Sequence, residues 1–205
     1  MGFEIDFCLG DEERELLSAL TLRVRVFTVL QIARTWPRTV ARLRRLEDAR
    51  LIFSFVTVAH PELPLLRPVA SWQAGCGAPD FAKASYELRS RWRLPGTATK
   101  CIIASQAAGR MFGGHGGRYP RESEETHDIH LAAVYLRYRL SCPALCASWV
   151  HEEEIKRDRK QRRGRVPDAV VNKSKVVEFG GAYKKEKLLL FHKFCEGRGL
   201  EYEVW

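Results

Sequence analysis

The sequence lacks any long hydrophobic run, since no stretch of its 205 residues approaches the roughly 20 apolar residues of a membrane helix. Its N-terminal stretch, MGFEIDFCLGDEERE, is acidic and does not have the basic, apolar and small-residue regions of a signal peptide. Asp6 stands where an acylation signal has Ser or Thr, so Gly2 is not expected to be acylated. We therefore expect a cytoplasmic protein that does not associate with membranes.

Closely spaced cysteines are also missing. The six cysteines are scattered along the chain, and without a secretion signal we expect reduced thiols. His127, His130, Cys142 and Cys146 have the side chains of a four-ligand zinc site. Neither pair, however, has the tight CxxC spacing of structural zinc sites. For His127 and Asp128 we prefer the interpretation that they cap or pack the start of a helix.

The common nucleotide-binding loops are absent, because no GxGxxG or GKS/T pattern opens a helix. The glycine-rich stretch GGHGGRYP, residues 113–120, has no apolar periodicity. We predict that residues 113–125 are a linker between two parts, residues 1–112 and 126–205, and a phosphate-binding loop is the alternative. With 45% hydrophobic residues, the chain can form one large domain or two small ones.

Positive charge is what the chain has in excess. Its net charge is +9, and arginine, which supplies much of it, is the side chain best shaped for phosphate and guanine. We expect a polyanion as partner, and specifically double-stranded DNA. Ribosomal binding, a membrane surface and a protein adaptor with an acidic partner would produce a similar composition.

The first half of the chain predicts three short helices followed by two strands. Helices are expected at residues 11–20, at 28–36, where Thr28 and Gln31 form a capping box, and from 37 onward. Residues 51–58 and 69–72 predict the two strands of a wing. This order is typical of a winged helix-turn-helix, whose third helix lies in the major groove; a helical bundle with a solvated arginine face is the alternative. The arginines expected to face DNA are Arg38, Arg42 and Arg45.

The second half predicts a helix at 126–139, a strand at 147–150, a hairpin at 169–177, a helix at 183–195 and a strand at 200–205. Asp168 begins one hairpin strand and Glu178 ends the other, so antiparallel pairing would place them side by side, where they can bind Mg²⁺. The alternative is a hairpin whose acids only cap or solvate its ends. A dense basic run precedes Asp168, and its residues expected to bind phosphates are Arg159, Lys160, Arg162 and Arg163.

This order of elements and the two carboxylates resemble the PD-(D/E)XK nuclease-like fold. The resemblance implies an α+β protein whose second domain has an αβββαβ core, with Asp168 and Glu178 as metal ligands. The family places a lysine two residues after the second carboxylate, and that position is Gly180 here. A lysine of the next helix is then the candidate for a catalytic role, and Glu152 or Glu154 is a further candidate ligand. The candidate lysines are Lys184, Lys185 and Lys187, of which we select Lys185.

Both halves together resemble the replication-relaxation family of plasmids and mobile elements, which joins an N-terminal winged helix to a PD-(D/E)XK-like domain. The matching pieces span most of the chain: LGDEERELLSAL, VLQIARTW, RTVARLRRLEDARLI, THDIHLAAVYLRYRL, VPDAVV and VVEFGGAYKKEKLLLFHKF. The resemblance implies DNA binding in the maintenance, replication or transfer of such an element, whose other proteins are candidate partners. Two functions stay open: a DNA-binding protein with a degenerate nuclease-like domain, which Gly180 favours, and a Mg²⁺-dependent DNA endonuclease.

Overall fold

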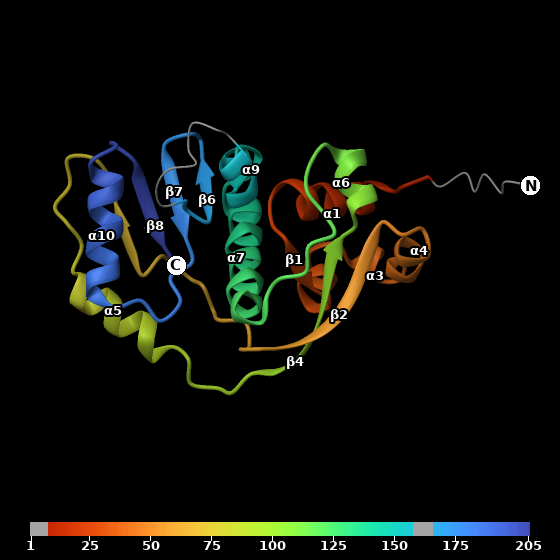
Figure 1. Cartoon of the computed structure of the whole chain (residues 1–205), viewed down its shortest axis with the longest axis horizontal. Helices are drawn as coiled ribbons and strands as arrows, with labels where there is room; N and C mark the ends of the chain where they lie inside the picture. Colours follow the sequence, from red (N-terminus) through yellow and green to blue (C-terminus); the bar gives the residue numbers. More distant parts are fainter. Residues whose placement is uncertain (1–7, 158–165) are drawn as a thin grey trace, which may run out of the picture.

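The computed structural model describes residues 8–157 and 166–205, which form an α+β fold with two β-sheets (Figure 1). The smaller sheet and its helices lie at one end of the molecule and the larger sheet and its helices at the other. The long helix α7 (Glu122–Ser141) stands between them. Within the described ranges, no helix combines the length and the apolar character needed to cross a bilayer.

The smaller sheet has three antiparallel strands in the order β1-β4-β2. They are β1 (Val26–Thr28), β2 (Ile52–Ala59) and β4 (Thr97–Ala104). The helices of this part are α1 (Asp11–Leu22), α2 (Val29–Thr35), α3 (Pro37–Val40), α4 (Leu43–Asp48) and, after β4, α6 (Gln106–Phe112). The predicted capping box is confirmed, because the Gln31 N–H donates to Thr28 Oγ1 at 3.0 Å and the Thr28 N–H donates to Gln31 Oε1 at 2.9 Å.

The strand that follows β2 in the sequence does not pair with it, so the predicted wing is wrong in its second strand. β3 (Ala70–Trp72) was expected to return beside β2, but it pairs with β8 (Glu201–Val204) in the larger sheet. β4 takes the place beside β2, with a register that runs from Ile52–Ala104 to Ala59–Thr97. The Trp72 ring is buried against Tyr202 of β8, with ring centroids 6.1 Å apart. Burial of this aromatic ring outweighs proximity in the sequence.

A second element of the first half also packs on the larger sheet. The helix α5 (Phe81–Ser90) contacts α10 (Lys185–Glu196), and Phe81, Leu88 and Phe191 belong to one buried apolar cluster. The predicted boundary at residue 113 therefore does not separate the packing units, because β3 and α5 precede it in sequence.

The larger sheet has the strand order β3-β8-β7-β6-β5, in which β7 and β8 are parallel and the other pairs antiparallel. Its remaining strands are β5 (Val150–His151), β6 (Ala169–Val171) and β7 (Lys175–Glu178). With α7 and α10 they follow the predicted order of helix, three strands, helix and strand. Several bounds differ by a few residues: α7 begins at Glu122 and ends at Ser141, and α8 (Pro143–Ala147) takes the first residue of the strand predicted at 147–150. The helix α9 (Glu152–Arg157) follows β5.

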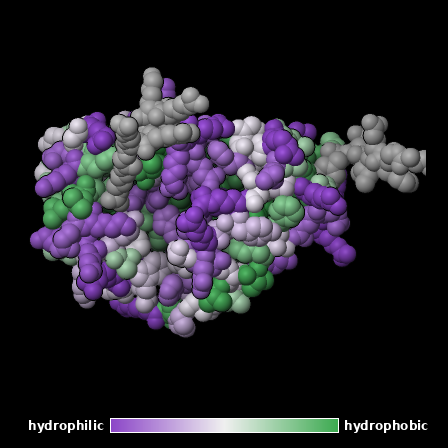
Figure 2. Space-filling view, in the orientation of Figure 1, coloured by the Kyte–Doolittle hydropathy of each residue, from purple (hydrophilic) through white to green (hydrophobic). Residues whose placement is uncertain are grey.

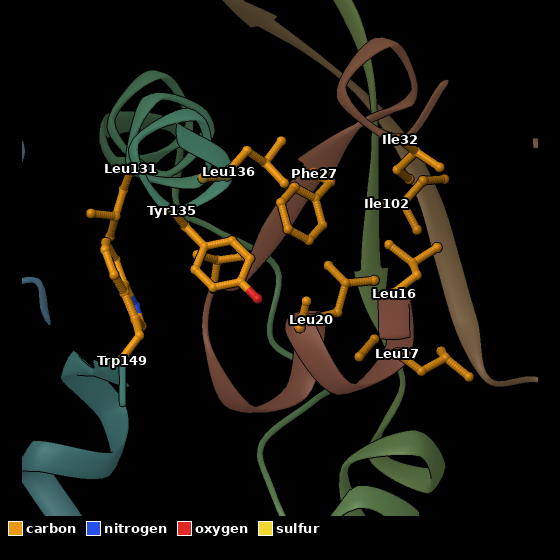
Figure 3. Packing of buried hydrophobic residues seen from close by; sticks show 14 of the residues in the cluster. Leu16, Leu17, Leu20, Phe27, Ile32, Ile102, Leu131, Tyr135, Leu136 and Trp149 are labelled. Carbon is orange, nitrogen blue, oxygen red and sulfur yellow. The ribbon is translucent and has the colours of Figure 1, made fainter. Parts of the chain in front are cut away.

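One apolar core joins α7 to the smaller sheet. Figure 3 shows leucines of α1 and Phe27 of β1 facing Tyr135 and Leu136 of α7. The Phe27 and Tyr135 ring centroids are 6.2 Å apart, and Trp149 lies 5.5 Å from Tyr135 on the other side. Because aromatic and leucine side chains from both halves share this core, separating the halves would expose a large apolar area.

The glycine-rich stretch predicted as a linker packs against the smaller sheet and α1. The His115 N–H donates to Thr21 O at 2.8 Å, and the Gly117 N–H donates to Ala104 O at 2.7 Å. A Cβ atom at Gly114 would lie 2.2 Å from Thr21 O, and one at Gly116 would lie 2.1 Å from the Ser105 carbonyl oxygen. The glycines are therefore explained by close approach of the backbone, which a side chain would prevent.

Candidate functional site

The hairpin β6–β7 places Asp168 and Glu178 beside each other, as predicted. Ala169 pairs with Val177, and the next positions outward in this antiparallel register are Asp168 and Glu178. Asn172 and Lys173, with φ of 50° and 60°, form the turn that closes the hairpin. The local turn and the β-branched strands thus bring two carboxylates to one end of the sheet.

Asp168 is held by two donors. The Phe179 N–H donates to Asp168 Oδ2 at 2.7 Å, and His127 Nε2 lies 3.0 Å from the same oxygen. The other ring nitrogen, His127 Nδ1, lies 3.2 Å from Asp128 Oδ1. Burial alone would lower the pKa of His127, but Asp168 and Asp128 outweigh it and raise that pKa to about 10. His127 is therefore an imidazolium at neutral pH, placed between two carboxylates.

Asp128 connects this pair to a buried ionic cluster, defined here as Arg25, Asp128, Glu124 and Glu153. The Arg25 guanidinium, whose side chain is 7% exposed, bonds Asp128 and lies 3.2 Å from Glu153 and 3.5 Å from Glu124. Burial would raise the pKa of Asp128, but His127 and Arg25 lower it. The structure thus assigns ion pairing to His127 and Asp128 in the second turn of α7, not capping. Hydrophilic side chains predominate over the middle of the molecular face in Figure 2, in front of α7 and α9.

Zinc ligation finds no support in the same residues. The described ranges contain no group of three or more His, Cys, Asp or Glu side chains arranged to hold a metal ion. Cys142 is exposed, whereas Cys146 is buried with its thiol 4.0 Å from Tyr135 O. His130 is buried, and its Nδ1 lies 2.7 Å from Thr126 O of its own helix. Cys146 and His130 thus pack in the interior beside backbone carbonyl oxygens.

Glu178 is 3% exposed and accepts a hydrogen bond from the Tyr183 hydroxyl at 2.8 Å. Lys187 Nζ lies 3.4 Å from the centroid of the Tyr183 ring. Lys185 is the exposed first residue of α10, so Lys187 is the lysine that contacts the Glu178 environment through Tyr183. The role assigned to Lys185 stays a prediction.

The position after Phe179 has no room for a side chain. A Cβ at Gly180 would lie 2.8 Å from Val204 Cγ1 and 3.1 Å from Leu88 Cδ1. Leu88 comes from α5, the helix that the first half of the chain contributes to the larger sheet. The missing lysine is therefore tied to the packing of α5, and a lysine at residue 180 would require Leu88 to move.

The acid pair does not fit Mg²⁺ in this arrangement, although its carboxylate oxygens are the right kind of donor. The His127 imidazolium on Asp168 would repel a divalent cation. Glu152 and Glu154, the two candidates for a third metal ligand, form ion pairs with other side chains. The Glu152 carboxylate bonds Lys156, and the Glu154 carboxylate lies 2.6 Å from Arg157 and 3.2 Å from His115.

The arginines of the predicted third helix do not lie on one continuous helix, which corrects that prediction. The chain breaks between α3 and α4 at Arg42, whose N–H donates to Thr39 O at 2.9 Å in a tighter turn than an α-helix makes. The Arg38 side chain is 89% exposed and lies 3.8 Å from Glu12. Arg42 lies 3.5 Å from the buried Glu13, and Arg45 donates to Cys8 O at 3.2 Å. All three arginines are exposed at the molecular surface beside the start of α1.

The basic run predicted to bind phosphates begins in α9, where Lys156 and Arg157 pair with Glu152 and Glu154. Its four named residues lie outside the described ranges: Arg159, Lys160, Arg162 and Arg163.

Comparisons with protein-family models, with curated proteins and with solved structures found no match for this chain. Sequence reasoning missed Arg25, which stands between two valines, and Arg91, which follows a helix end, because each acquires its partners only through folding.

Proposed function

We propose that this protein binds double-stranded DNA through a winged helix-turn-helix formed by α1 to α4 and the sheet β1-β4-β2. The observation that carries the proposal is the exposed arginine surface of α3 and α4, on a small domain in which four short helices precede β2 and β2 pairs antiparallel with β4. Arg38, Arg42, Arg44 and Arg45 are exposed there, and the whole chain has a net charge of +9. Guanidinium groups at such a surface suit phosphate oxygens and guanine edges.

In this proposal the larger sheet with α7 and α10 is a PD-(D/E)XK-like scaffold that docks DNA or a partner without cutting. Two contacts support the loss of cleavage. His127 holds Asp168 as an internal cation, and Leu88 with Val204 fills the space beside Gly180. A role in the maintenance of a plasmid or mobile element, with other proteins of that element as partners, belongs to the same proposal.

A Mg²⁺-dependent endonuclease is the second candidate, and the adjacency of Asp168 and Glu178 in the hairpin favours it. Incubation of supercoiled plasmid with Mg²⁺ or Mn²⁺ separates the two candidates. We expect no nicking by the wild-type protein. If the wild type nicks the plasmid and both Asp168→Ala and Glu178→Ala abolish this activity, the larger sheet is the core of a nuclease and not a docking scaffold.

DNA binding is tested by fluorescence anisotropy with a labelled duplex over a series of salt concentrations. The double variant Arg38→Gln/Arg45→Gln should bind more weakly, and the slope of log affinity against log salt should fall by about 0.9 per lost phosphate contact. Lys193→Gln/Arg198→Gln, two exposed cations at the end of α10, removes the same charge from another surface. Equal weakening by both double variants would contradict the assigned reading surface.

A further inference from the structure

Arg91, the residue that follows α5, is half-buried and contacts the end of β7 in the larger sheet with its guanidinium. Its Nη2 donates to Gly180 O at 2.7 Å. Its Cζ lies 4.4 Å from the Phe179 ring centroid and 5.0 Å from that of Trp92. Phe179 also stacks on His130, with ring centroids 5.1 Å apart. The arginine is thus positioned by aromatic contacts at the strand end that carries the acid pair.

Among the described residues no carboxylate forms an ion pair with Arg91, and its buried Nε has no hydrogen-bond partner there. Burial lowers the pKa of Arg91 to about 10, and Tyr183 acts in the opposite direction. Burying a charge without a counter-charge is unfavourable, so the arrangement is suited to an anion that arrives from outside.

A pocket of about 120 Å³ is open to Arg91. Three other side chains that line it, His60, Trp92 and Arg93, offer nitrogen donors or an aromatic face. A water molecule occupies about 30 Å³ in the liquid, so the pocket has room for a tetrahedral oxyanion. Glu62 is the carboxylate in the lining, and its Oε1 lies 3.7 Å from Arg34 of α2, which offsets its charge.

We propose that Arg91 and this pocket bind a phosphate group of a nucleic-acid strand. Residue 180 is glycine and has no side chain at this strand end. The Arg91 guanidinium, from the residue after α5, places a positive charge there instead. Arginine can contact two phosphate oxygens at once, which a lysine cannot do. The choice of a nucleic-acid strand as the source of the phosphate rests on the proposed DNA-binding function.

The test compares the wild type with Arg91→Gln and with Arg89→Gln. Glutamine at 91 keeps a donor for Gly180 O but removes the charge, and Arg89 is an exposed arginine of α5 that does not line the pocket. Inorganic phosphate is titrated at constant ionic strength against chloride while the Tm is measured. We expect phosphate to raise the Tm of the wild type and of Arg89→Gln, and to leave that of Arg91→Gln unchanged. If Arg91→Gln does not fold, Arg91→Lys replaces it, with a weaker phosphate effect expected.

The second arm measures duplex binding by the same proteins. We expect Arg91→Gln to lower the salt slope by about 0.9, the value for one phosphate contact. If phosphate stabilises the protein through Arg91 but Arg91→Gln binds duplex DNA as the wild type does, the ligand is free phosphate. That result would overturn the proposal that a nucleic-acid strand supplies the phosphate. No difference between Arg91→Gln and Arg89→Gln in either arm would overturn the site. If Arg38→Gln/Arg45→Gln alone weakens binding, the DNA-binding proposal survives and only Arg91 is dismissed; a wild type that binds no duplex dismisses the proposed function itself.

Discussion

Arg25, whose side chain is 7% exposed, and the half-buried Arg91 have opposite surroundings. Arg25 lies at the junction of the two sheets, where Asp128, Glu124 and Glu153 neutralise it. Arg91 lies at the edge of the larger sheet, against aromatic rings and a carbonyl oxygen. Both leave Nε without an acceptor in the described ranges, so the difference lies in the counter-charges. A fully paired buried charge joins two parts of a fold, whereas an unpaired one at a pocket indicates a ligand.

The largest effect is expected when Arg25 is removed. Arg25→Met removes the cation shared by the buried Asp128 and the partly exposed Glu124 and Glu153, and should lower the free energy of unfolding by up to about 3–5 kcal/mol. Arg91→Met, which leaves no carboxylate unpaired, should cost much less. Urea denaturation of the two variants measures both values, and equal losses would erase the distinction between the two arginines.

A smaller effect is expected at Gly180. Gly180→Ala adds a methyl group against Val204 and Leu88 and should destabilise the protein by about 1–3 kcal/mol. Gly181→Ala is the matched control, because no atom lies within 4 Å of its added Cβ. Denaturation midpoints give the comparison, and a Gly180→Ala protein as stable as Gly181→Ala would show that the Leu88 side chain yields easily.

The His127 interaction should appear in the pH dependence of stability. The folded-state pKa of His127 is raised to about 10 from 6.5, so the folded protein binds an extra proton between these values. The stabilisation is therefore complete below about pH 6.5 and is lost as the pH rises toward 10. The difference in unfolding free energy between wild type and His127→Gln should shrink over that range. A constant difference would mean that His127 acts by packing alone.

The smallest stability effect is expected for Arg38, whose side chain is 89% exposed. Arg38→Gln should change the unfolding free energy by less than about 0.5 kcal/mol, yet weaken duplex binding. Thermal unfolding and anisotropy on the same preparation test this separation of stability from binding. A large loss of stability would show that the Glu12 contact holds α3 against α1.

Local signals in the sequence predicted local structure well. The Thr28–Gln31 capping box, the polar turn at 172–175 and the order of elements in the second half are all present. The adjacency of Asp168 and Glu178 also followed from the sequence, since the register of a short hairpin is set by its turn. Such features depend on residues a few positions apart.

Long-range partners could not be predicted in the same way. β3 was predicted as a strand from its residues, but only burial of Trp72 against Tyr202 selects it for the larger sheet. His127 appeared to be a helix cap until folding placed Asp168 on its Nε2.

The sequence by itself determined a basic α+β protein, most of its helices and strands, and a hairpin that brings two acids together. Only the tertiary structure decided what those acids contact, which side chains crowd residue 180 and which half-buried arginine has no carboxylate in an ion pair with it among the described residues. The physical reason is that the charge state and accessibility of a side chain depend on the atoms around it. In this protein those atoms come from residues tens of positions away, as His127 lies 41 residues from Asp168.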